Sequence, residues 1–131
     1  MRKPPKIRKK RIVAQTRMFC VEELDLEFDN GIHASYERLQ PNYRAAVLVV
    51  PVQDDGETVL LIREYAAGVH RYELALPKGR IEHGEDLLQA ANRELMEEVG
   101  YGANRLTHLK TFTVAPGLTA VSYTHLRAHE T

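Results

Sequence analysis

Three glutamates in the second half of the chain are spaced so that together they could bind a metal ion. Glu94, Glu97 and Glu98 stand at positions i, i+3 and i+4, so an α-helix would bring their carboxylates out on one side. They would lie in its last turns, where the helix dipole disfavours each anion by about 0.3–1 kcal/mol. Arg93 alone is too little positive charge to offset this. A divalent cation would be enough, and Mg²⁺ prefers a few carboxylates together with substrate phosphates.

The neighbouring residues predict that helix and a tight loop before it. From Asp86 onward apolar residues recur at three- and four-residue spacing, as in an amphipathic helix whose rim would hold the glutamates: Leu88, Ala91, Leu95 and Val99. Gly100 is placed to end the helix. Gly79 and Gly84 flank the loop, and such a loop brings backbone groups close to a metal–phosphate centre. The alternative is an acidic helix end that only keeps the protein soluble. The glutamates alone would favour it, and the glycines favour the metal site.

The loop and the helix together resemble the Nudix box. Gly79 is followed after five residues by Glu85, and after seven more by the run Arg93–Glu94–Leu95–Met96–Glu97–Glu98–Val99–Gly100–Tyr101. This matches the box at every fixed position. The last position is usually aliphatic and is Tyr101 here. Because the pattern fixes seven identities across 23 residues, it is a specific motif.

Similarity beyond the box points to a subgroup of the family. Over roughly residues 10–120 the chain resembles the bacterial ADP compounds hydrolases, in segments that include 17–38, 62–66 and 72–74. Pro116 falls 16 residues after Gly100, a placement that resembles the ADP-ribose pyrophosphatases and would mark substrate binding. A turn beside Gly117 explains this proline equally well.

The resemblance implies a role for each residue of the box. The three glutamates would bind Mg²⁺ or Mn²⁺, and the backbone carbonyl of Lys78 would add a ligand. Glu85 and Arg93 would pair and brace the loop against the helix. The implied reaction is hydrolysis of a diphosphate linked to a nucleoside, so that ADP-ribose would give AMP and ribose 5-phosphate. Bound metal would neutralise the diphosphate and lower the pKa of the attacking water.

Two residues before the loop are weaker candidates for substrate binding. Arg63 could hold a substrate phosphate through two hydrogen bonds. A surface ion pair with Glu64 or Glu73 explains Arg63 about as well. Glu73 could reach the metal centre, but pairing at the edge of the core is the stronger expectation for it.

The rest of the chain predicts an α/β fold. We expect strands over residues 12–15, 18–28, 32–39, 45–50, 58–65 and 106–114. Strands, then a helix, then a strand are typical of a mixed α/β arrangement. The resemblance implies a Nudix-type α/β/α sandwich with a mixed β-sheet, which we place at residues 12–120 as one domain.

Both ends are expected to lie outside that domain. Residues 1–11 carry seven basic groups and no acid, which is typical of a disordered arm. Residues 121–131 resemble no strand of the family and look like translated adapter sequence, so we expect a non-native tail. The family's C-terminal elements would then be missing. We therefore expect the native-length enzyme to be active, and this chain to be weak or inactive and prone to aggregation.

Composition excludes several other classes of protein. Hydrophobic residues make up 44% of the chain and charged residues 27%, with a net charge of zero, as in globular proteins. The longest apolar run, Ala45–Val52, is too short to span a bilayer. No apolar segment of a signal peptide follows the basic start. The single cysteine, Cys20, cannot form an intramolecular disulfide. These features favour a cytoplasmic protein with no membrane partner.

Three functions are compatible with these residues. The leading hypothesis is Mg²⁺-dependent hydrolysis of ADP-linked compounds by a homodimer, the dimer being implied by the family. A second keeps the box but takes dinucleoside polyphosphates, NADH or capped RNA. A third is a non-catalytic nucleotide- or RNA-binding module that uses the basic arm and binds with a steep salt dependence. Because a pure binder has no need of three clustered carboxylates, no nucleic-acid partner is expected.

Overall fold

The chain forms two compact units in a computed structural model that describes residues 2–40 and 45–130. Unit 1 combines residues 1–44 with 113–121, and unit 2 combines residues 45–112 with 122–131. Met1 and Thr131, the outer bounds of the predicted arm and tail, lie outside the described residues. Residues 12–120, predicted as a single domain, contribute to both units, and the single domain stays a prediction.

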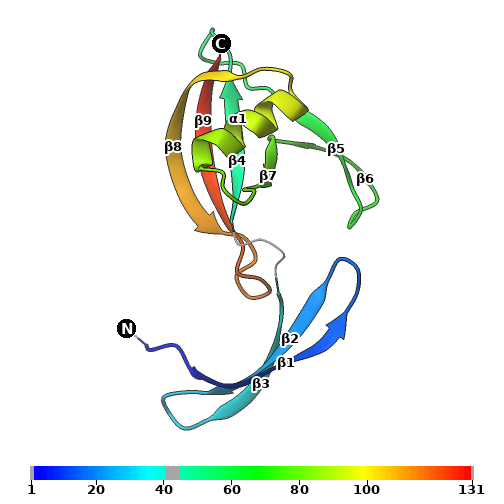
Figure 1. The fold of residues 1–131 in the computed structure, drawn as a ribbon, viewed down its shortest axis with the longest axis vertical. Coiled ribbons are helices and arrows are strands. Elements are labelled where there is room, and N and C mark those ends of the chain that lie inside the picture. Colours follow the sequence, from blue (N-terminus) through cyan, green and yellow to red (C-terminus); the bar gives the residue numbers. More distant parts are fainter. Residues whose placement is uncertain (1, 41–44, 131) are drawn as a thin grey trace. The chain divides into compact units, whose positions relative to one another are not determined.

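Unit 1 is built on an antiparallel three-stranded sheet in the order β1–β2–β3 (Figure 1). Its strands are β1 (Lys6–Gln15), β2 (Cys20–Glu27) and β3 (His33–Leu39). In β2 the buried side chains of Leu24 and Leu26 alternate with acidic residues, which is the period of a strand with one covered face. The turn into β3 contains Gly31, whose φ of 83° suits glycine. The hairpin predicted from this alternation is present.

The basic residues near the start belong to a strand, not to the disordered arm that their charge predicted. Residues 6–11 are the first part of β1, and acidic side chains of β2 lie opposite them. Arg8 pairs with Glu27, and Arg11 pairs with Glu23. The run of basic residues shows no partner by itself, because the acids that pair with it lie on β2.

Unit 2 contains a four-stranded mixed sheet in the order β7–β4–β9–β8. Its strands are β4 (Ala45–Val52), β7 (Lys78–Arg80), β8 (Ala103–Thr113) and β9 (Ser122–Glu130). β9 runs parallel to β4, and β7 runs antiparallel to it. This confirms the predicted mixed sheet. A separate hairpin of β5 (Ile62–Ala66) and β6 (Arg71–Ala75) precedes β7.

β9 is an inner strand of this sheet, although residues 121–131 were expected to form a non-native tail. Thr124, Leu126 and Ala128 are buried and alternate with the more exposed His125 and Arg127, as in a strand packed on one face. The tail prediction therefore gains no support. The strand still carries a cost. The buried Nδ1 of His125 and Nε of Arg127 have no hydrogen-bond partner within the described part of the chain, and such atoms cost about 1–3 kcal/mol each.

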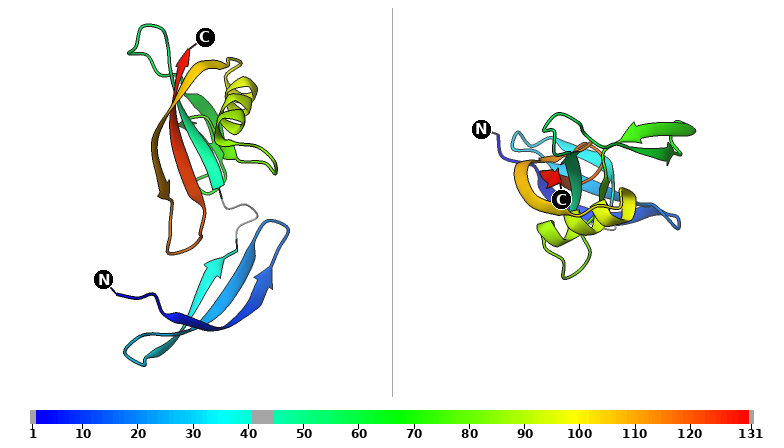
Figure 2. Two further views of the ribbon diagram at one scale, coloured as in Figure 1. Left: turned by 60° about the vertical axis from the view of Figure 1, so that its left-hand side comes forward. Right: turned by 90° about the horizontal axis from the view of Figure 1, so that it is seen from above.

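The helix α1 (Leu87–Glu98) packs on one face of the four-stranded sheet (Figure 2). Asp86 begins it through a capping box, because its side chain accepts the N–H of Gln89 at 2.8 Å and the side chain of Gln89 accepts the N–H of Asp86 at 3.0 Å. Gly100 follows its end with a φ of 78°. Residues 2–40 and 45–130 contain no helix that is long and apolar enough to cross a membrane.

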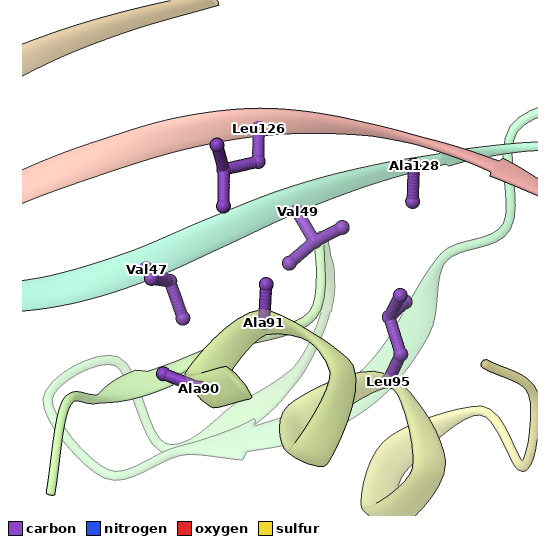
Figure 3. Close-up of a cluster of buried hydrophobic side chains, with 7 residues drawn as sticks. All are labelled: Val47, Val49, Ala90, Ala91, Leu95, Leu126 and Ala128. Carbon is purple, nitrogen blue, oxygen red and sulfur yellow. The ribbon is translucent and has the colours of Figure 1, made fainter. Parts of the chain in front are cut away.

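A small core between α1 and the sheet fixes the rotation of the helix. Figure 3 shows its side chains, which come from β4, β9 and α1: Val47, Val49, Leu126, Ala128, Ala90, Ala91 and Leu95. Ala91 and Leu95 face the core as predicted, but Leu88 is 53% exposed and Ala90 takes its place. One helical layer is present among the described residues. The second layer of the predicted α/β/α sandwich stays a prediction.

Candidate active site

The short strand β7 places loop backbone against two glutamates of α1. Glu94 is 7% exposed, and its carboxylate lies so close to Gly79 that a Cβ there would collide with it. The backbone N–H of Lys78 donates to Oε2 of Glu98 at 3.1 Å. The glycine is therefore required by a close approach of side chain to backbone, and two of the three predicted ligands meet the loop.

Arg93 ties the loop to the helix. Its Nε and Nη2 donate to the two carboxylate oxygens of Glu85 at 2.8 and 2.9 Å, and Nη2 also donates to the carbonyl of Arg80 at 3.0 Å. Its Nη1 contacts Oε1 of Glu94 at 2.8 Å and Oε2 of Glu97 at 3.4 Å. The hydrogen bonds with Glu85 raise the pKa of Arg93 and lower the pKa of Glu85. The structure thus contains the expected Glu85–Arg93 pair.

Glu98 lies where negative charge accumulates. Burial raises the pKa of the Glu98 carboxyl, and the nearby carboxylates of Glu94 and Glu64 raise it further. The N–H of Lys78 acts in the opposite direction. Glu64 comes from β5, and its Oε2 accepts a hydrogen bond from Nζ of Lys78 at 2.8 Å. A cation near Glu98 would relieve this repulsion.

Glu97 is the exposed member of the three glutamates. Its side chain is 59% exposed, and its Oε2 lies 3.4 Å from Nη1 of Arg93. In the described ranges no three His, Cys, Asp or Glu side chains are arranged to hold a metal ion. Metal binding by the three carboxylates therefore stays a prediction.

The residues nevertheless fit a divalent cation. Glu94 and Glu98 supply carboxylate oxygens, the ligands that Mg²⁺ and Mn²⁺ prefer. The absence of a Cβ at Gly79 lets the Glu94 carboxylate lie directly against the loop backbone. The crowding of acids around Glu98, together with this close approach, supports the fit.

The predicted substrate-binding residues lie on β5, on β6 and in the segment 113–121. Arg63 is exposed on β5 opposite Leu74. The ion pairs suggested for Arg63 are not formed, since Glu64 binds Lys78 and Glu73 binds Arg71 at 2.7 Å. Pro116 belongs to unit 1, in the segment 113–121 whose Leu118 carbonyl accepts the N–H of Leu39 at 2.7 Å.

Sequence reasoning did not single out Glu64 or the side chain of Lys78 as partners. Glu64 stands 14 residues before Lys78, and β6 lies between them in the chain. A lone acid in a short strand gives no spacing signal. Glu64 belongs to the first strand of the β5–β6 hairpin, and Lys78 begins β7, which follows that hairpin.

Comparison with known proteins covers both units. The NUDIX domain family matches residues 42–130, and the NudE-type Nudix hydrolase N-terminal domain matches residues 5–38. ADP compounds hydrolase NudE of Escherichia coli (strain K12) is 55% identical over 104 residues, which cover 79% of this chain and 55% of that protein. ADP-ribose pyrophosphatase of Bacillus subtilis (strain 168) is 31% identical over 80% of this chain and 58% of its own length. The chain thus spans somewhat over half the length of these curated relatives.

A solved structure extends the comparison to β9. The crystal structure of an ADP compounds hydrolase matches with a TM-score of 0.91 and 46% identity, and covers 99% of this chain and 69% of that chain. A match of this extent includes most of residues 122–130. It agrees with the placement of β9 inside the sheet.

Proposed function

Because this chain belongs to the Nudix family, we propose that it hydrolyses the diphosphate bond of ADP-linked compounds such as ADP-ribose, with AMP and a phosphate ester as products. The observation that carries the proposal is the pair of contacts that hold Glu94 against Gly79 and Glu98 against the N–H of Lys78. The names of the two relatives, an ADP compounds hydrolase and an ADP-ribose pyrophosphatase, support this class of substrate.

The proposed metal site uses carboxylates of α1 and backbone of the loop. Glu94 and Glu98 would hold Mg²⁺ or Mn²⁺, with Glu97 and the carbonyl of Lys78 as further ligands. When bound, the metal would neutralise the diphosphate and activate water. The chain's own part is positioning: Arg93 fixes the loop through Glu85 and the carbonyl of Arg80, so that backbone and carboxylates keep their spacing.

Arg63 and Glu73 are proposed to bind substrate at the hairpin of β5 and β6. Arg63 is exposed and has no ion-pair partner in the described part of the chain, which leaves its guanidinium available for a phosphate. Glu73 is half-buried and held by Arg71. Pro116 is kept as a proposed marker of substrate preference. Homodimer formation and a cytoplasmic location also remain proposals.

The function is tested with the 131-residue chain, ADP-ribose and Mg²⁺, with products separated by anion-exchange chromatography. AMP and ribose 5-phosphate are expected, because a weak or inactive chain was expected only on the ground of a non-native tail, and residues 122–129 instead pair with β4. Glu98→Gln should lower turnover by about 100-fold or more while circular dichroism stays unchanged. Glu57→Gln, on an exposed turn, is the matched control and should behave as wild type.

Other outcomes would redirect the proposal. Faster cleavage of dinucleoside polyphosphates, NADH or capped RNA in the same assay would assign one of these as the substrate. Binding of nucleotide or RNA without AMP release would contradict an enzymatic role. Normal turnover by Glu98→Gln would contradict the assignment of the metal site.

A further inference from the structure

Lys78 joins three elements of unit 2 at one point. Its backbone pairs with Leu48 of β4, its N–H donates to Glu98 of α1, and its ammonium binds Glu64 of β5 at 2.8 Å. The next residue, Gly79, lies against Glu94. Small movements of Lys78 would therefore change the surroundings of both glutamates.

The backbone pairing of β7 is a weak anchor for such a position. β7 has three residues, lies at the edge of its sheet, and pairs with one neighbour, β4. An edge strand this short can fray, because few ladder hydrogen bonds hold it. The bond from Lys78 to Glu64 adds a second anchor, which comes from β5.

We propose that Glu64 is a positioning residue of the candidate site: through its ion pair with the Lys78 side chain, it keeps the Lys78 N–H directed at Glu98. The inference rests on the proposed function, because it assigns Glu64 to the same metal site. Glu64 need not touch the metal or the substrate for this role.

The exposure of the Lys78–Glu64 ion pair distinguishes a positioning role for Glu64 from a role in stabilising the fold. The Lys78 side chain is 36% exposed and that of Glu64 is 49% exposed. An ion pair this open to solvent contributes little to the free energy of unfolding. Its loss is therefore expected to change metal binding while the melting temperature stays close to that of wild type.

The signs of two substitutions distinguish positioning from simple charge. If Glu64 acted only through its negative charge, Glu64→Gln would weaken Mn²⁺ binding and Lys78→Met would strengthen it, with additive effects. If Glu64 acts through Lys78, both substitutions weaken binding, and the double variant is no worse than either single one.

The experiment measures Mn²⁺ binding to the 131-residue chain by electron paramagnetic resonance, without substrate. We expect Glu64→Gln and Lys78→Met each to raise the dissociation constant about tenfold, the lower end for residues that orient ligands. Lys78→Arg, which keeps a cation, should recover most of the affinity. Glu23→Gln, which breaks an ion pair of unit 1 with Arg11, is the matched control and should bind as wild type. Opposite signs for the two substitutions, or unchanged binding by Glu64→Gln, would overturn the inference.

The same measurements distinguish a failure of this inference from a failure of the proposed function. A wild-type chain that binds no Mn²⁺ and leaves ADP-ribose intact would refute both. A wild type that binds and hydrolyses, with a Glu64→Gln variant equal to it, would refute the positioning role alone. Should Glu64→Gln fail to fold, the comparison of Lys78→Met with Lys78→Arg decides: equal affinity in the two would overturn the inference, and recovery by arginine would support it.

Discussion

Gly79 and Glu94 are in contact across the loop and the helix, with the carboxylate of Glu94 occupying the space that a side chain at position 79 would need. Glu94 is buried there, and its Oε1 accepts a hydrogen bond from Nη1 of Arg93 at 2.8 Å. The position of Glu94 thus depends on residue 79. The absence of a Cβ there permits the Glu94 carboxylate to lie against the loop, where the metal is proposed to bind.

Replacement of Gly79 by alanine should displace the Glu94 carboxylate without unfolding the chain. The colliding atoms are at the far end of a flexible side chain, which can move at small cost. We expect Mn²⁺ affinity and ADP-ribose turnover to fall about 10–100-fold, with an unchanged far-ultraviolet circular dichroism spectrum.

Gly68→Ala is the control for this substitution, because nothing lies within 4 Å of a Cβ at that position and its φ is ordinary. It should retain wild-type affinity and turnover. Equal activity of the two alanine variants would show that the contact has no part in the site.

The pair of Glu85 and Arg93 predicts how stability depends on pH. Hydrogen bonds from Arg93 and from the N–H of Glu82 hold the pKa of Glu85 below its usual value. A carboxylate of this kind contributes stability that is present above its unfolded pKa, about 4.3, and is lost as the pH falls through the folded value. Glu85→Gln should therefore melt below wild type at pH 7, and the gap should narrow below about pH 4.

This prediction is checked by thermal unfolding between pH 3 and pH 7, followed by circular dichroism. Glu57→Gln serves again as the exposed control, and its melting temperature should follow that of wild type throughout. A gap between Glu85→Gln and wild type that is as wide at pH 3 as at pH 7 would argue against the pair as its source.

Because β9 is an inner strand, removal of one of its buried side chains should strongly destabilise the fold. Leu126 is 2% exposed and packs with Val49 and Leu95 in the core under α1. Leu126→Ala should lower the free energy of unfolding by about 2–5 kcal/mol, measured with urea. Leu109→Ala, on β8 at 52% exposure, should change it by less than about 0.5 kcal/mol. If the two variants are equally stable, residues 122–130 do not form part of the core.

The sequence predicted best where spacing and chemistry act locally. The box fixed the loop glycines, the Glu85–Arg93 pair and the helix from Asp86 to Gly100, because all of them lie within 23 consecutive residues. Resemblance to the family was confirmed by the comparisons. The metal ligands, the substrate contacts and the second helical layer stay predictions.

Features that depend on distant partners could not be predicted in the same way. The basic residues of β1 lie opposite acids on β2, and the Lys78 side chain binds Glu64. β9 alternates buried and less buried residues as a strand should, but its residues alone indicate no strand of the family, and its pairing with β4 joins opposite ends of unit 2. Leu88 fits the helical period but is exposed, because the sheet packs against a different side of the helix.

The parallel pairing of β4 with β9 also sets the order in which unit 2 can form during synthesis. Ala45 pairs with Ser122, so an inner strand of this sheet comes from residues translated long after those it adjoins. Until they leave the ribosome, the apolar faces of β4 and α1 have no complete cover. Such a nascent chain keeps apolar surface exposed to water until residues 122–130 arrive, since long-range strand pairing is slow.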